Sequence, residues 1–201
     1  MKLDLVIAGV GGQGNILASQ TLAKCAMDEG FTVVNTETKG AAQRGGSVLS
    51  HLRISSDRQI YSPLVPKGQA DVLLGFEPLE AMRYINLLSR QGKYIINTAP
   101  VPTILAKLNI DRYPTQEEMI NTIGLLDGKG YFIDATQAAS ELGDVLLTNV
   151  VMLGAFTEIN ALLKPETVLS KLLSQIKESY HTDDVKAFNR GRELIQVLQA
   201  K

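Results

Sequence analysis

Short apolar runs alternate with helical patterns over the first two thirds of the chain. The segment from Leu3 to Ala8 is apolar and rich in strand formers, and a glycine-rich turn separates it from a helical pattern that ends at Asp28. Gly30 stops that helix, and the chain from Phe31 to Thr36 is predicted to form a second buried strand. A strand, a tight turn, a helix and a strand are typical of a βαβ unit, so we predict a parallel sheet.

Two further strand patterns interrupt this arrangement. One runs from Ser47 to Ile54 and the other from Gln59 to Tyr61, with the polar turn 55–58 between them. Strands joined by a short polar turn are typical of an antiparallel hairpin. We therefore expect a hairpin inserted in the α/β pattern, and a sheet that is mixed but mostly parallel.

The α/β pattern then resumes. Strands are predicted at residues 71–75, 93–97 and 131–134, and a helix from about Pro78 to Ser89, because proline is tolerated in the first turn of a helix. Residues 98–102 contain two prolines and are expected to form a loop. This loop follows a strand end, where α/β proteins place ligands and partners.

The last third of the chain is predicted to be helical. A helical pattern runs from Thr136 to Leu163 with a break near Gly143, and two more helices follow, one opening with Pro165 and one over residues 183–199. We expect their apolar stripes to pack on the sheet, with a partner surface as the alternative. The stripe residues are Val168, Leu169, Leu172, Leu173 and Ile176, then Val185, Phe188, Ile195 and Leu198.

These patterns predict one α/β domain over residues 1–201. The domain is expected to have a Rossmann-like, mixed and mostly parallel sheet flanked by helices, with an inserted β-hairpin and a helical C-terminal part over about residues 144–201.

Charge and hydropathy narrow the possible partners. The chain has 20 basic and 21 acidic residues, so neither nucleic acid nor an anionic membrane is expected as the main partner. The longest apolar stretch, from Leu146 to Leu163, contains polar residues and falls short of the roughly 20 apolar residues that span a membrane. The N-terminal residues do not have the pattern of a signal peptide, so we expect a cytoplasmic location.

The chain has few residues that could bind a metal or act as a nucleophile. Cys25 is the single cysteine, which excludes an internal disulfide and a four-thiolate iron–sulfur site in one chain. His51 and His181 are far apart in the sequence and match no metal or triad spacing. We assign no catalytic residue and no metal site to this chain.

The first glycine-rich segment has the spacing of a dinucleotide-binding turn. Gly9, Gly11 and Gly14 match that spacing, and Glu37 lies near where an acid that binds the ribose would be expected. Lys39 and Arg44 would better suit a 2′-phosphate, and no tyrosine has a lysine four residues later. The segment thus predicts either NAD(P) binding or simply close packing of the strand and helix.

A second glycine-rich segment spans residues 39–47. Its glycines surround the side-chain amide of Gln43 and the guanidinium of Arg44, a combination suited to binding a phosphate, a carboxylate or another chain. The candidate residues of the two segments are Gly9, Gly11, Gly12, Gln13, Gly14, Lys39, Gly40, Gln43, Arg44, Gly45, Gly46 and Ser47.

Several blocks in order resemble the gamma-type subunits of 2-oxoacid:ferredoxin oxidoreductases. The resemblance is greatest to the beta subunit of indolepyruvate ferredoxin oxidoreductases and extends over nearly the whole chain. The blocks are residues 9–14 (GVGGQG), 39–48 (KGAAQRGGSV), 61–66 (YSPLVP), 70–80 (ADVLLGFEPLE) and 149–154 (NVVMLG).

The resemblance implies a subunit without its own cofactor, in an enzyme that oxidatively decarboxylates aryl pyruvates to acyl-CoA and reduces ferredoxin. Thiamine diphosphate and iron–sulfur clusters would belong to a large partner subunit, and CoA would bind in the complex. The two glycine-rich loops would face the partner and its active-site cavity, with Arg44 contacting an anionic group or a carboxylate of the partner. The isolated chain is expected to be inactive and able to form a homodimer.

Three alternatives stay open at this point. The complex could instead use pyruvate, ketoisovalerate or 2-oxoglutarate. The chain could be a stand-alone NAD(P)-dependent reductase, as the glycine spacing suggests. It could also be a nucleotide-sensing or assembly module without enzymatic activity.

Overall fold

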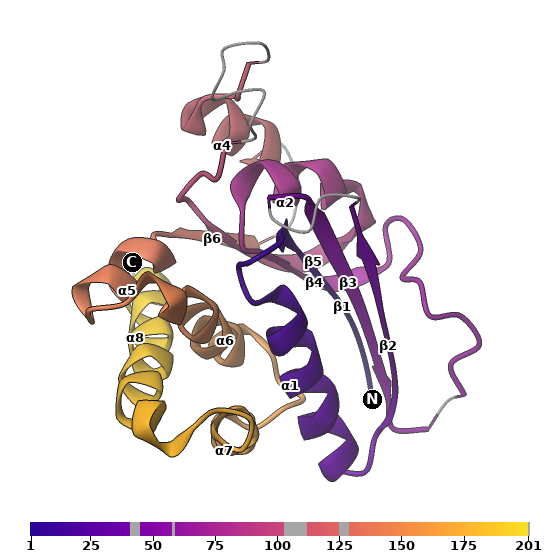
Figure 1. Ribbon diagram of the computed structural model, residues 1–201. Helices are drawn as coiled ribbons and strands as arrows, with labels where there is room; N and C mark the ends of the chain where they lie inside the picture. Colours follow the sequence, from indigo (N-terminus) through magenta and orange to yellow (C-terminus); the bar gives the residue numbers. More distant parts are fainter. Residues whose placement is uncertain (41–44, 58, 103–111, 125–128, 201) are drawn as a thin grey trace.

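The computed structural model describes residues 1–40, 45–57, 59–102, 112–124 and 129–200. A six-stranded mixed sheet lies at its centre, with helices on both faces (Figure 1). The strand order is β2-β3-β1-β4-β5-β6. The strands are β1 (Lys2–Val10), β2 (Thr32–Lys39), β3 (Ser47–Ser55), β4 (Ala70–Gly75), β5 (Leu88–Asn97) and β6 (Lys129–Ile133).

The parallel part of the sheet follows the prediction. Strands β1, β4, β5 and β6 pair in parallel with their neighbours in that order. Strand β3 is antiparallel to both β1 and β2, so the sheet is mixed. The predicted fold class, a Rossmann-like and mostly parallel mixed sheet flanked by helices, is confirmed.

Two predictions about the antiparallel part were wrong. Residues 59–61 form no strand, and β3 pairs with β2 and β1 instead of with that segment. Strand β2 is a partly exposed edge strand and not a buried neighbour of β1, because β3 lies between them. A short connection can join antiparallel strands, whereas parallel pairing needs a long crossover, so β3 folds back directly along β2.

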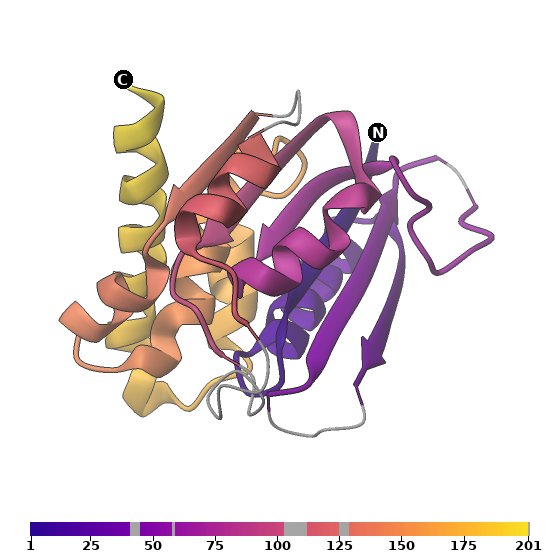
Figure 2. The same ribbon diagram turned by 90° about the horizontal axis from the view of Figure 1, so that it is seen from above.

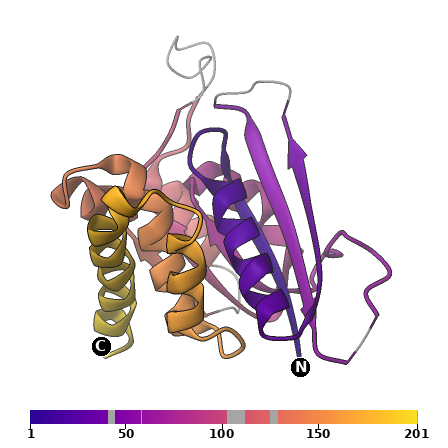
Figure 3. The ribbon, with the colours of Figure 1, turned by 60° about the horizontal axis from the view of Figure 1, so that its bottom comes forward.

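The alternation of side chains along β1 separates two layers of the core. Leu5 and Ile7 face the layer that contains helix α1 (Asn15–Asp28), whereas Val6 and Ala8 face helix α2 (Pro78–Tyr84). Figures 1 and 3 show α1 on the same face as the C-terminal helices. Helix α4 (Gln116–Gly124), which the sequence patterns did not predict, packs beside α2 on the opposite face.

Helix α2 is shorter than predicted. It ends at Tyr84 and passes through a 3₁₀ turn, Ile85–Leu87, into β5, so the strand begins five residues earlier than expected. The predicted start at Pro78 is confirmed, and the side chain of Glu77 caps the helix by accepting a hydrogen bond from the backbone N–H of Glu80 at 2.8 Å.

The C-terminal part is helical, as predicted, and the break near Gly143 is confirmed by a φ of 104°. In the described part of the chain no helix is long and apolar enough to cross a membrane. The helices are α5 (Ala135–Glu141), a 3₁₀ turn (Val145–Leu147), α6 (Thr148–Ile159), α7 (Pro165–Leu173), a 3₁₀ turn (Glu178–Tyr180) and α8 (His181–Gln199).

The apolar stripes of α7 and α8 pack mainly on the protein's own core. Val168, Leu172, Phe188 and Ile195 are buried in the same cluster as β1 and α1. Helices α6 and α8 approach so closely that a Cβ atom added at Gly191 would lie 1.9 Å from the backbone oxygen of Val151. The stripes therefore pack on the protein's own core, as expected, but mainly through helices α1 and α6 and not on the sheet itself.

A buried carboxyl group in α8 makes the stability sensitive to pH. The Oδ2 atom of Asp184 is buried without a hydrogen-bond partner, and burial raises the pKa of this group despite the attraction of His181. A folded-state pKa above the unfolded one means that stability falls as pH rises from the ordinary aspartate range through the raised value. We expect Asp184→Asn to have a higher Tm than the wild type at pH 7, with the difference disappearing at acidic pH; an equal Tm at both pH values would contradict this.

Candidate functional site

The first glycine-rich turn joins the end of β1 to the start of α1. Gly12 and Gly14 have φ values of 103° and 81°, which are conformations that favour glycine. Gln13 closes the turn, because its Oε1 accepts from the backbone N–H of Val10 at 2.9 Å and its Nε2 donates to the backbone oxygen of Phe76 at 3.0 Å. This side chain therefore ties the turn to the end of β4.

The second glycine-rich segment contacts the first directly. The backbone N–H of Gly11 donates to the oxygen of Gly46 at 2.8 Å, and the N–H of Gly45 donates to the oxygen of Gly11 at 3.2 Å. Gly40 closes the base of the loop by donating to the oxygen of Ser47 at 2.7 Å. The structure thus joins the described parts of both predicted segments into one edge. Gln43 and Arg44 lie outside the described residues.

The polar residues beside this edge are already engaged. Ser47 Oγ donates to the Oε2 of Glu80 at 2.6 Å, and Lys39 forms an ion pair with Glu37, with 3.6 Å between Nζ and Oε2. Glu37 also accepts from Ser19 on α1, so its carboxylate faces that helix. Because β3 lies between β2 and β1, Glu37 is about 10 Å from the strand that carries the turn.

The space at the turn is small for a dinucleotide. A hollow of about 80 Å³ lies beside Gly11, Gly12 and Asn15. A Cβ atom added at Gly14 would lie 2.3 Å from Nδ2 of Asn149 at the start of α6, so this glycine is required for close packing. The geometry favours the packing interpretation of the glycines over NAD(P) binding.

A larger cleft lies on the other side of the turn. It has a volume of about 210 Å³ and an apolar rim, because Val145 and Leu146 of the 3₁₀ turn are exposed. Its walls come from four segments that are distant in the sequence. The lining residues are Gly12, Gln13, Val101, Thr136, Val145, Leu146 and Thr148.

Asn97 at the end of β5 organises the floor beneath this cleft. It is fully buried, and its Nδ2 donates to the backbone oxygen of Phe76 at 3.1 Å and to Oγ1 of Thr136 at 2.9 Å. Its Oδ1 accepts from the backbone N–H of Ala135 at 3.0 Å. One side chain therefore fixes the ends of β4, β5 and the start of α5 relative to one another.

Glu77 positions the loop at the cleft. Besides capping α2, its carboxylate accepts from the backbone N–H of Val101 at 3.2 Å and from the hydroxyl of Tyr113. Burial raises the pKa of Glu77, while its hydrogen bonds oppose that shift. Sequence reasoning missed Asn97 and Glu77; their only signals were a polar residue that ends a predicted strand and an acid before the proline of a helix.

The remaining candidate groups for chemistry are structural. Burial raises the pKa of the Cys25 thiol to about 12, which makes the thiol inert at neutral pH. His51 is buried, and its Nδ1 accepts from the backbone N–H of Val65 at 3.2 Å. Among the residues that the structure describes, no group of three His, Cys, Asp or Glu side chains could hold a metal ion.

The fold and this edge define the class of protein. It is a Rossmann-like α/β domain in which two glycine-rich segments pack together at strand ends, beside a cleft with an apolar rim. Residues 4–194 match the model of the family described as pyruvate ferredoxin/flavodoxin oxidoreductase. The chain belongs to this family, and the resemblance found in the sequence is confirmed.

Individual relatives agree with the family. The chain is 37% identical over 192 residues to "Indolepyruvate oxidoreductase subunit IorB" of Pyrococcus horikoshii, covering 94% of each chain. It is 28% identical over 197 residues to "2-oxoglutarate synthase subunit KorC" of Methanothermobacter thermautotrophicus, covering 97% of this chain and 96% of that one. The fold is similar to that of pyruvate oxidoreductase subunit PORC from Thermotoga maritima, with a TM-score of 0.74, 22% identity and 96% of each chain covered.

Proposed function

We propose that this chain is the small subunit of a ferredoxin-dependent 2-oxoacid oxidoreductase that acts on indolepyruvate and other aryl pyruvates. The observation that carries the proposal is the 37% identity, over 94% of both chains, to a relative named as an indolepyruvate oxidoreductase subunit. In the proposed reaction, a 2-oxoacid and CoA are converted to acyl-CoA and carbon dioxide. Two ferredoxins each take up one electron, and one proton is released.

We assign the cofactors of this reaction to a large partner subunit. The one cysteine of the chain is buried, and its described residues offer no group of metal ligands, so these residues do not fit an iron–sulfur cluster. Thiamine diphosphate would supply the group that accepts the acyl carbon of the substrate.

The proposed role of this chain is to close the active-site cavity. The reacting groups held by the partner subunit would need shielding from water, and a rigid covering edge would provide that shield. The glycine-rich edge is held by Gln13 and by backbone hydrogen bonds between Gly11 and residues 45–46, and the apolar rim at Leu146 lies beside it. In this proposal the edge faces the partner subunit, with Arg44 contacting an anionic group there. The complete set proposed to face the partner is Gly9, Gly11, Gly12, Gln13, Gly14, Lys39, Gly40, Gln43, Arg44, Gly45, Gly46 and Ser47.

A second candidate substrate is 2-oxoglutarate. The 28% identity to a relative named as a 2-oxoglutarate synthase subunit supports it less strongly, because the identity is lower at similar coverage.

We further propose that residues 1–201 form one domain and that the protein is cytoplasmic. We also propose that its complex reduces ferredoxin and that the isolated chain can form a homodimer.

The deciding experiment is co-expression of this chain with the large thiamine- and iron–sulfur-binding subunit encoded near it. The complex would be assayed anaerobically with CoA, an electron acceptor, and indolepyruvate, phenylpyruvate, pyruvate or 2-oxoglutarate. Turnover that requires both chains and is fastest with aryl pyruvates is expected. Absence of any association, together with tight NADH or NADPH binding by the isolated chain, would instead favour a stand-alone reductase.

A variant of the turn tests the role of the edge within that complex. Gln13→Ala removes the hydrogen bond that ties the turn to the end of β4 and the one that Gln13 accepts from Val10, so we expect kcat to fall by about 10- to 100-fold through misplacement of the edge, with assembly unchanged. Gln20→Ala, on the exposed face of α1, is the matched control and should leave kcat unchanged. If Gln13→Ala and Gln20→Ala had equal kcat values, the turn would not be part of the active-site cavity.

A further inference from the structure

One segment that carries the family resemblance has no role in the proposed active-site edge. Residues 59–69, which we name the strap, contain the block from Tyr61 to Pro66 and have no regular secondary structure. The strap leaves the sheet after β3 and returns at β4, and it projects on the side of the sheet where β2 lies (Figures 1 and 2).

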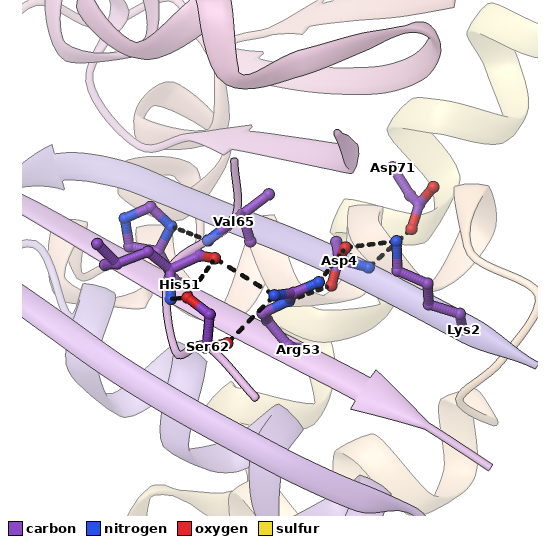
Figure 4. A network of polar contacts seen from close by, with 8 residues as sticks. Lys2, Asp4, His51, Arg53, Ser62, Val65 and Asp71 are labelled. Carbon is purple, nitrogen blue, oxygen red and sulfur yellow. Dashed lines mark hydrogen bonds and ion pairs between the residues drawn. The ribbon is translucent and has the colours of Figure 1, made fainter. Parts of the chain in front are cut away.

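The backbone of the strap is held by two side chains of β3. Arg53 donates from Nη1 to the backbone oxygens of Ser62 at 3.1 Å and Leu64 at 3.4 Å. The N–H of Val65 donates to Nδ1 of His51 at 3.2 Å, which requires a neutral imidazole; burial, and then the charge of Arg53, lowers the pKa of His51 and favours that form. An irregular segment is thus held at three residues, Ser62, Leu64 and Val65 (Figure 4).

Arg53 is itself fixed by a buried carboxylate. Asp4 on β1 is 1% exposed, and its two oxygens accept from Nε of Arg53 at 2.8 Å and from Nη2 at 3.1 Å. Lys2 adds a second cation at 2.7 Å, and the backbone N–H of Asp4 donates to Asp71 at 2.7 Å (Figure 4). Buried ion pairs seldom add net stability over apolar packing. The clearest structural effect of this network is therefore that it holds the strap in place.

The strap presents apolar side chains to solvent. Tyr61 is 88% exposed and Leu64 is 51% exposed, and a pocket of about 270 Å³ lies beside Tyr61. Exposed aromatic side chains on a rigid backbone are typical of the residues that dominate binding energy, because little conformational entropy is lost when a partner binds.

The charges in the pocket indicate the chemistry of the occupant. Among the described residues that line it, three have charged side chains, namely Lys2, Asp4 and Arg53. Asp4 accepts two hydrogen bonds from Arg53 and also pairs with the ammonium of Lys2, which is 44% exposed, so two cations share one carboxylate among these described residues and Lys2 keeps an exposed positive charge. The surface therefore complements an apolar group next to an acidic one.

We propose that the strap is a docking surface for the large partner subunit, which places an apolar side chain against Tyr61 and Leu64 and a carboxylate beside Lys2. The inference rests on the proposed function, because that function requires such a partner. Lys2 and Asp4 lie at the start of β1, whereas the glycine-rich edge follows its end, so this surface is separate from the active-site edge. The strap holds the subunit in the complex, and the glycine-rich edge covers the reaction.

The test uses the reconstituted complex and the double variant Tyr61→Ser/Leu64→Ser. Because both side chains are exposed, the isolated variant should keep the circular dichroism and Tm of the wild type. The Kd for the large subunit is expected to rise by about 30-fold, the loss typical of a binding hot spot, while kcat at saturating small subunit stays unchanged. Lys2→Gln should weaken binding less and reduce its dependence on salt. Val197→Ser, an exposed apolar site on α8, is the matched control.

The outcomes separate this inference from the proposed function. If the wild-type chains associate and the double variant binds with unchanged Kd, the docking surface is overturned and the proposed function stands. If the wild-type chains do not associate at all, both are overturned. If the double variant abolishes only self-association of the isolated chain, the occupant is a second copy and the proposal is overturned.

Discussion

Replacing Gly191 with alanine is expected to lower the free energy of unfolding by about 3 kcal/mol. The new Cβ atom would lie 1.9 Å from the backbone oxygen of Val151 and 2.9 Å from the backbone nitrogen of Ala155. Both atoms belong to the backbone of α6, so no rotation of a side chain can relieve the overlap, and the two helices must move apart. The core between them, which includes Phe188, would then lose contacts.

Urea unfolding followed by circular dichroism measures this loss. Asn189→Ala, on the exposed side of the same helix, is the matched control and should change the free energy of unfolding by no more than about 0.5 kcal/mol. A Gly191→Ala midpoint equal to that of the control would show that α6 and α8 do not pack as closely as the structure has them.

The second large effect is expected in the network beneath the strap. Asp4→Leu removes the carboxylate that holds Arg53 and Lys2, and breaking a buried pair on one side costs about 3 kcal/mol. The reverse variant, Arg53→Met, leaves the buried carboxylate of Asp4 with Lys2 as its remaining cation. The double variant Asp4→Leu/Arg53→Met should be destabilised much less than the sum of the single variants, because neither charge is left in a buried position.

A double-mutant cycle in urea measures this coupling. Additive effects of the two substitutions would show that the ion pair contributes nothing to the fold. The double variant should also exchange the amide hydrogen of Val65 faster than the wild type, because the strap loses the hydrogen bonds from Arg53 to its backbone. This readout connects the network to the docking surface independently of global stability.

Much of the fold could be predicted because its signals are local. Apolar runs marked β1, β4 and the core of β5, Gly30 and Gly143 marked helix ends, and Pro78 marked the start of α2. Helical spacing placed Val168 and Phe188 in the core. Each of these features depends on a few neighbouring residues, so it can be recognised from the sequence alone.

Strand order could not be predicted in the same way. The sequence showed where β2 and β3 lie, but which strands pair depends on contacts between residues far apart in the chain, and β3 was assigned the wrong partner. That error also made Glu37 a candidate ribose ligand, since in a simple βαβ unit β2 would lie beside the turn. With β3 between them, its carboxylate faces α1 instead.

The sequence by itself determined that this chain has an α/β fold with two glycine-rich segments, and its ordered motifs identified the family. Only the tertiary structure decided that Gly11 pairs with residues 45–46, that Asn97 and Glu77 position segments that line the cleft, and that Asp4 and Arg53 fix the strap. The physical reason is that propensity and periodicity act over a few residues, whereas a polar site is defined by which buried donors and acceptors meet across the fold.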